Sequence, residues 1–156
     1  MTQSTDPTLA AGTEAPAPGT EPFAPGTESF ASGSEITAEF EVTGWDERAY
    51  DEPAEGGTLA RVTVRKAFRG AVDGTSVAEL LTAANRAYVA SERFTGSIAG
   101  RHGSVVYQHG GVDDAENPRT FGHIVPGTAT GDLAGLRGTI TFRHDDTGHH
   151  VTLVLG

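Results

Sequence analysis

The sequence predicts an all-β protein, an eight-stranded antiparallel up-and-down barrel that follows a disordered N-terminal tail. Two observations support this fold class. From Ile36 to Leu155, short runs alternate apolar and polar residues with a period of two, as half-buried strands do. Glycine-rich turns separate these runs, and no long helical pattern lies between them. Closing such a series of hairpins into a barrel removes the exposed sheet edges.

Residues 1–33 differ in composition from residues 34–156, which we assign to the barrel domain. A Gly-Thr-Glu or Gly-Ser-Glu unit recurs every seven residues between positions 12 and 35, without a lysine or an arginine. The prolines and glycines disfavour a helix, and the segment has little apolar surface to offset chain ordering. We therefore predict a disordered acidic tail. The alternative is that Phe23 and Phe30 anchor a partner.

The strands of the barrel domain are expected in chain order. We predict them at residues 36–45, 60–68, 76–84, 87–98, the run ending at His109, 119–125, 138–144 and 149–155. An acidic, turn-rich loop is expected at 46–57. Segment 76–84 also has helical propensity, but it is short and lies inside a serial meander. The alternating apolar positions predict a core that contains Phe40, Val62, Val64, Phe68, Phe94 and Ile98.

The composition excludes several classes of function. The formal net charge is −10 and Lys66 is the only lysine, so no polybasic patch exists for nucleic acid or an anionic membrane. The absence of cysteine excludes disulfides, thiolate catalysis and cysteine-bound zinc. No segment approaches the roughly 18 apolar residues of a membrane helix, and the N-terminus lacks the features of a secretory signal. We expect a cytoplasmic protein.

Several short motifs follow one another in an order that is typical of one bacterial family. They are Trp45 with Glu47, Phe68-Arg69-Gly70, Gly74-Thr75-Ser76, Glu92-Arg93-Phe94-Thr95-Gly96, Gly100-Arg101-His102-Gly103-Ser104, Gln108-His109, and the run from Pro126 to Gly138. Residues 34–155 together resemble the actinobacterial domain of unknown function 3224 family, whose folds are similar to the allene oxide cyclase barrel. The resemblance implies that fold and brings no settled activity.

Two glutamates are the first candidates for chemistry. If Asn85-Arg86 is a two-residue turn, Ala84 pairs with Ala87, and Glu79 then lies directly opposite Glu92 on the same face. Two carboxylates ~5 Å apart at Cβ and partly desolvated do not both ionise readily. We predict that Glu92 keeps a proton near neutrality and acts as an acid–base or ligand-orienting group. The alternative is that one or both carboxylates pair with Arg93, Arg86 or Arg101 on the outer surface.

A histidine adds a third candidate, because its ordinary pKa suits proton transfer near neutrality. Gln108 and His109 are adjacent on one strand, so only one of them points into the barrel. The alternative for His109 is a hydrogen-bonded structural role. The predicted catalytic residues are Glu92, Glu79 and His109, and the predicted ligand-binding residues are Gln108, Tyr88, Trp45 and Phe94.

Neither a metal nor a cofactor is predicted. The residues His144, Asp145, Asp146, His149 and His150 have the composition of metal ligands. However, Asp-Asp-Thr-Gly is ordinary turn chemistry, and no third ligand is fixed by spacing. The run 127–131 is similar to a phosphate loop but lacks the required Lys after its last glycine. We expect one helical turn there, with leucines that close one end of the barrel.

Three functions remain open, because an eight-stranded barrel encloses side chains or one small ligand. The first is a cofactor-independent isomerase or cyclase that acts on an apolar small molecule in the barrel cavity. The second is a non-catalytic, lipocalin-like barrel that binds such a molecule. The third is a structural module that forms homo-oligomers through the barrel walls. The orientation of Glu79, Glu92 and His109 toward or away from the interior separates the first two.

Overall fold

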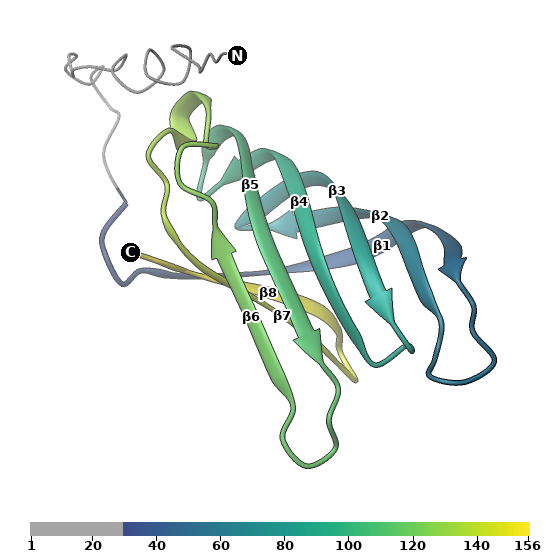
Figure 1. The fold of residues 1–156 in the computed structure, drawn as a ribbon. Coiled ribbons are helices and arrows are strands. Elements are labelled where there is room, and N and C mark those ends of the chain that lie inside the picture. The colour runs from purple at the N-terminus through teal and green to yellow at the C-terminus, as the bar shows by residue number, and fades with distance from the viewer. Residues whose placement is uncertain (1–29) are drawn as a thin grey trace, which may run out of the picture.

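Every strand pairs with its neighbours in chain order, and the first strand also pairs with the last (Figure 1). The computed structural model describes residues 30–156. Its elements are β1 (Glu35–Asp51), β2 (Leu59–Gly70), β3 (Val72–Ala83), β4 (Ala87–Ile98), β5 (Arg101–Val112), β6 (Arg119–Ile124), the short 3-10 helix η2 (Gly131–Leu133), β7 (Gly138–Asp145) and β8 (Gly148–Leu155). The predicted eight-stranded antiparallel barrel is confirmed.

Two segments test the boundaries drawn from the sequence. In the segment 76–84, which has helical propensity, residues 76–83 form a strand as predicted, as part of β3, and Ala84 belongs to the following turn. By contrast, the predicted loop at 46–57 is wrong in its first half, because β1 continues to Asp51 and pairs with β2 as far as Leu59. Charged residues are tolerated in this stretch because it has a sheet partner on one side only and is exposed to water.

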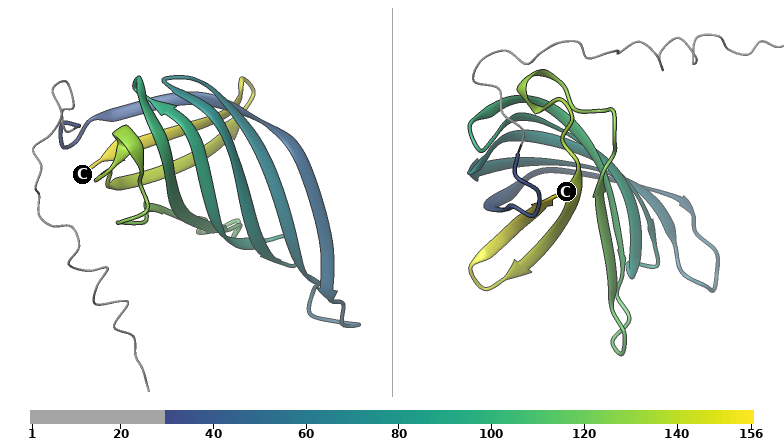
Figure 2. Two further views of the ribbon diagram at one scale, coloured as in Figure 1. Left: turned by 90° about the horizontal axis from the view of Figure 1, so that it is seen from above. Right: turned by 90° about the vertical axis from the view of Figure 1, so that its left-hand side faces the viewer.

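The barrel wall is complete at one end and open at the other. β1 pairs with β8 only from Glu35 to Phe40, and β6 shares a single bridge with β7, between His123 and Thr139. The second half of β1 and the first half of β6 therefore have a partner on one side only. β1 to β6 extend beyond the β7–β8 hairpin as a curved sheet (Figure 2). We call this part the open end of the barrel.

Apolar side chains fill the opposite end, which we call the closed end. All six predicted core residues are buried. Phe40, Phe68, Phe94 and Ile98 pack at the closed end with Leu133 and Leu136 of the predicted helical turn, whereas Val62 and Val64 form a separate cluster with Ala78. Two strands approach closely here at a pair of glycines, Gly74 and Gly96, which face each other with φ of +153° and +155°. A Cβ on either glycine would lie 2.2 Å from a backbone oxygen of the facing strand. Only glycine fits this contact, which lets the sheet bend around the core.

The described residues begin on the barrel itself. The ring of Phe30 packs against the core, and the guanidinium carbon of Arg101 lies 4.2 Å from its centroid. The backbone N–H of Gly33 donates a hydrogen bond to the carbonyl oxygen of Leu155 at 2.6 Å. Residues 30–33, which the composition assigns to the tail, thus contact the barrel. The rest of the predicted disordered tail lies outside the described residues.

Candidate functional site

Polar side chains from four neighbouring strands meet inside the barrel. Glu92 on β4 lies beside Tyr107 on β5 in the cross-strand register. Lys66 on β2 and Ser76 on β3 pair with each other one row nearer the closed end, and His109 lies one row nearer the open end. Each position follows the period of two that directs alternate side chains inward. We call these five residues the polar cluster.

Four donors converge on the carboxylate of Glu92. Its Oε1 accepts hydrogen bonds from Lys66 Nζ at 2.9 Å and from His109 Nε2 at 2.8 Å. Its Oε2 accepts hydrogen bonds from the Ser76 hydroxyl at 2.5 Å and the Tyr107 hydroxyl at 3.1 Å. Glu92 is only 1% exposed, so these donors take the place of water around a buried charge.

The cluster holds Glu92 in its ionised form. Burial raises the pKa of this carboxyl group, but the hydrogen bond from His109, the charge of Lys66 and the hydrogen bond from Ser76 outweigh burial and lower the pKa to about 2. Burial lowers the pKa of the Lys66 ammonium group, and the Glu92 carboxylate opposes that shift. The prediction that Glu92 keeps a proton near neutrality is therefore wrong, because a cation faces it instead of a second carboxylate.

The predicted pairing of Glu79 with Glu92 is also wrong. The turn between β3 and β4 contains three residues, 84–86, so that Ala83 pairs with Ala87. The first two turn residues have φ near +55°, a left-handed conformation that the sequence did not indicate. The register therefore differs by one residue from the predicted one, and a shift of one residue turns a side chain to the other face of the sheet.

Glu79 accordingly lies on the outer surface, where it faces Ser91 across the β3–β4 pair. Its carboxylate accepts hydrogen bonds from Arg61 Nε at 3.2 Å and from the Thr63 hydroxyl at 3.0 Å. Almost half of the Glu79 side chain is exposed. An arginine-paired surface position was the alternative for the glutamates, but the partner is Arg61 and not one of the three arginines expected.

A chain of hydrogen bonds connects the polar cluster with the open end. His109 is 4% exposed, and its Nδ1 lies 2.8 Å from the hydroxyl oxygen of Tyr88. Because Nε2 of the same ring contacts the Glu92 carboxylate, Tyr88, His109 and Glu92 form one continuous series. Burial and the Glu92 charge raise the pKa of the Tyr88 phenol, so the phenol keeps its proton near neutrality.

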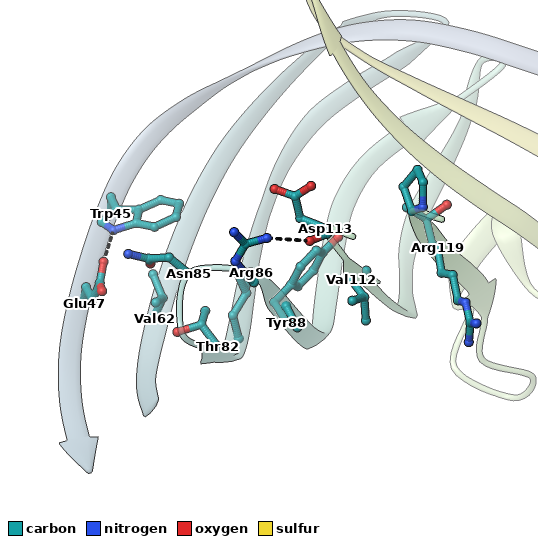
Figure 3. Close-up of a pocket in the computed structure, with 15 residues that line it drawn as sticks. Trp45, Glu47, Val62, Thr82, Asn85, Arg86, Tyr88, Val112, Asp113 and Arg119 are labelled. Atoms are coloured by element: carbon teal, nitrogen blue, oxygen red, sulfur yellow. Dashed lines mark hydrogen bonds between the residues drawn. The ribbon is translucent and has the colours of Figure 1, made fainter. Parts of the chain in front are cut away.

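The inner face of the open end forms an apolar groove. Its volume is about 430 Å³. It is lined by Trp45, Glu47, Val62, Leu80, Thr82, Asn85, Arg86, Ala87, Tyr88, Gly111, Val112, Asp113, Pro118, Arg119 and Thr120 (Figure 3). The indole of Trp45 remains 59% exposed, and its Nε1 donates a hydrogen bond to Glu47 Oε1 at 3.0 Å. A β-bulge after Val42 places Trp45 on this face.

The predicted ligand-binding residues separate into two groups. Trp45 and Tyr88 both line the groove. Phe94 is buried in the core of the closed end, and Gln108 points outward, where its Nε2 donates a hydrogen bond to the Ser91 hydroxyl. His109, rather than Gln108, is therefore the inward residue of that pair.

Sequence reasoning missed the cationic and hydroxyl members of the polar cluster. Lys66 follows Val62 and Val64 at alternate positions, so the period of two already directed it inward. A lone lysine at an inward position requires a buried partner, and this signal pointed to an anion inside the barrel. Ser76 and Tyr107 gave no comparable signal, because their contacts depend on which rows of the sheet lie side by side.

The residues that have the composition of metal ligands lie in and beside the turn between β7 and β8. No group of three or more metal-ligating side chains occurs in the part of the chain that the structure describes. The rings of His144 and His149 lie 4.3 Å apart, and Asp145 accepts hydrogen bonds from Thr147 within the turn.

Among residues 30–156, no helix has the length and apolar character that crossing a membrane requires.

These features define a β-barrel with a packed closed end, an internal ion cluster and an apolar groove at its open end. The chain belongs to the family described as "Protein of unknown function (DUF3224)", whose model matches residues 36–155. A crystal structure of a protein with unknown function from this family, from Shewanella oneidensis MR-1, is similar with a TM-score of 0.67 and 27% identity. The match covers 79% of this chain and 96% of that one. No curated protein matches the sequence.

Proposed function

We propose that this protein binds an apolar small molecule in the groove at the open end of the barrel. The observation that carries the proposal is the position of Trp45, a large aromatic side chain that stays mostly exposed on a concave face. Val62, Leu80 and Val112 supply further apolar lining. A volume of about 430 Å³ lies within the range of small-molecule sites, and such sites combine apolar walls with a few polar groups.

The charges around the groove favour a ligand without net charge. Two carboxylates, Glu47 and Asp113, and two guanidinium groups, Arg86 and Arg119, line it in equal number. Glu47 is engaged by the Trp45 indole, which holds the ring in place. Because opposite charges are balanced, neither an anionic nor a cationic ligand gains a large electrostatic advantage. Binding then depends on apolar contact and on the hydroxyl of Tyr88.

A second candidate function is a cofactor-independent isomerisation or cyclisation of such a molecule. The series from Tyr88 through His109 to Glu92 supports it, because it connects a groove residue with a buried anion through an imidazole. Glu92 would act here by stabilising a positively charged His109, and not as the acid that the sequence analysis proposed. The two candidates share one groove, so a test of binding comes first.

The single tryptophan provides the assay. N-phenyl-1-naphthylamine, a neutral apolar fluorophore, accepts excitation energy from a nearby indole, so titration of the full-length protein should give transfer from Trp45. Leu80→Asn places a polar group in the groove and should weaken binding roughly tenfold. Leu81→Asn is the matched control, because Leu81 is the next residue of β3 and is exposed on the outer face.

The Leu81→Asn control also tests whether the probe binds at a different site. A second apolar depression adjoins the groove, shares Tyr88 and Val112 with it, and extends over the exposed residues Tyr50, Leu81 and Phe121. If Leu81→Asn weakened binding and Leu80→Asn did not, the probe would occupy this second depression, and the proposed groove would be rejected. Absence of energy transfer at all probe concentrations would likewise reject it.

A further inference from the structure

The hydrogen-bond capacity of Glu92 fixes the direction of every bond in the cluster. An ionised carboxylate only accepts hydrogen bonds. Each of the four groups around it must therefore donate, and for His109 this means that Nε2 carries a proton. In the neutral imidazole the other nitrogen, Nδ1, then has no proton and is an acceptor. Toward this neutral imidazole, the Tyr88 hydroxyl, 2.8 Å away, donates its proton to Nδ1.

The direction of the Tyr88–His109 hydrogen bond limits how the Tyr88 hydroxyl interacts with a ligand in the groove. With its only proton directed at His109, the Tyr88 oxygen presents lone pairs to a ligand, and lone pairs accept hydrogen bonds. The partner must therefore be a donor, such as a hydroxyl group. A ligand carbonyl or ether oxygen would face another acceptor and would gain no hydrogen bond there. Tyr88 is half-buried and lines the groove, so a ligand in the groove reaches it.

We propose that Tyr88, His109 and Glu92 form a proton relay that selects a hydroxyl-bearing apolar ligand and accepts its proton. This inference rests on the proposed function and adds the chemical class of the ligand. In the transfer, the ligand O–H bond breaks and its proton joins the Tyr88 oxygen. The proton of Tyr88 moves to Nδ1 of His109 at the same time. The products are a ligand oxyanion and an imidazolium, with no oxidation or reduction.

The surroundings of His109 favour the imidazolium that this step forms. The Glu92 carboxylate lies 2.8 Å from Nε2, and the Phe142 ring of β7 lies 4.6 Å from the imidazole, centroid to centroid. Lys66 is the opposing charge, and it is engaged with the same carboxylate oxygen. The remaining titratable group in contact with Glu92 is Tyr107, whose pKa burial raises well above its ordinary value, so that it stays neutral. The relay thus resembles the orientation of a catalytic histidine by a carboxylate.

Two naphthalenes test the selectivity. 2-Naphthol carries a donor hydroxyl, whereas 2-methoxynaphthalene has nearly the same shape and lacks the donor. In competition with N-phenyl-1-naphthylamine on the full-length protein, naphthol should bind roughly three- to tenfold more tightly, the effect of one hydrogen bond. Tyr88→Phe should abolish the difference. Tyr50→Phe is the matched control, because Tyr50 is an exposed tyrosine that lines the second depression and not the groove.

Fluorescence of bound naphthol tests the proton transfer itself. Excited 2-naphthol is a strong acid, and its deprotonated form emits at longer wavelength, so a nearby acceptor increases that band. The band should be strong with the wild-type protein and Tyr50→Phe, and should be lost with Tyr88→Phe. His109→Gln keeps a donor toward Glu92 but cannot accept a mobile proton, so it should bind naphthol and also lose the band.

The outcomes separate the two proposals. If neither naphthalene displaced the probe, the proposed groove itself would be rejected. If both displaced it equally, or if the preference for naphthol persisted in Tyr88→Phe, the groove would stand and the relay would be overturned. A bound naphthol that emitted only from its protonated form would also overturn the relay.

Discussion

Replacement of Glu92 by glutamine gives the sharpest test of the polar cluster. The change removes the negative charge and keeps the shape of the side chain. It leaves the Lys66 ammonium group, which is only 8% exposed, without an anionic partner. The new side-chain amide also points its N–H₂ group, a donor, at groups of the polar cluster that are themselves donors. Breaking a buried ion pair by removing one partner commonly costs about 3–5 kcal/mol.

The pKa of Glu92 gives an independent magnitude. The environment lowers it from 4.5 to about 2. At about 1.4 kcal/mol per pKa unit, ionised Glu92 then contributes roughly 3 kcal/mol of stability at neutral pH. Because the folded state holds the lower pKa, this contribution is present above pH 4.5 and disappears as the pH falls toward 2. Both routes therefore predict a loss of about 3 kcal/mol or more for Glu92→Gln at pH 7.

Urea unfolding followed by far-ultraviolet circular dichroism measures this loss. Glu79→Gln is the matched control, since its ion pair with Arg61 is exposed and should cost less than about 1 kcal/mol. The difference in stability between wild type and Glu92→Gln should also shrink between pH 5 and pH 2. A Glu92→Gln variant as stable as the wild type at pH 7 would refute the reasoning, since only a carboxyl group that is already protonated tolerates this change.

Two further predictions concern the core and the N-terminal segment. Phe94→Ala should lower the free energy of unfolding by ~3–5 kcal/mol, because Phe94 is 1% exposed and its ring contacts Phe68 edge to face. A urea midpoint equal to that of the wild type would contradict the placement of Phe94 in the core. The composition predicts that residues 1–33 are dispensable for folding, but residues 30–33 contact the barrel. Deletion of residues 1–29 should therefore leave the melting temperature nearly unchanged, whereas a loss of cooperative unfolding would show that the segment stabilises the barrel.

The sequence alone determined the number, order and inward faces of most strands. Period-two alternation is local, so each strand identified its own buried positions, from Phe40 to Ile98, without knowledge of its neighbours. The same rule pointed Lys66 and Glu92 inward. Short turns and the absence of helical patterns then left an up-and-down barrel as the economical arrangement.

The tertiary structure decided which inward residues meet. The β3–β4 register depended on a left-handed conformation in the turn 84–86, and one residue of difference exchanged Glu79 for Ala78 beside Glu92. The stagger between strands then brought Lys66 and His109, from rows on either side, to the same carboxylate oxygen. Such diagonal contacts are absent from any local pattern, because they arise only when the sheet twists and closes. For this reason the sequence located Glu92 inside the barrel but assigned it the wrong charge.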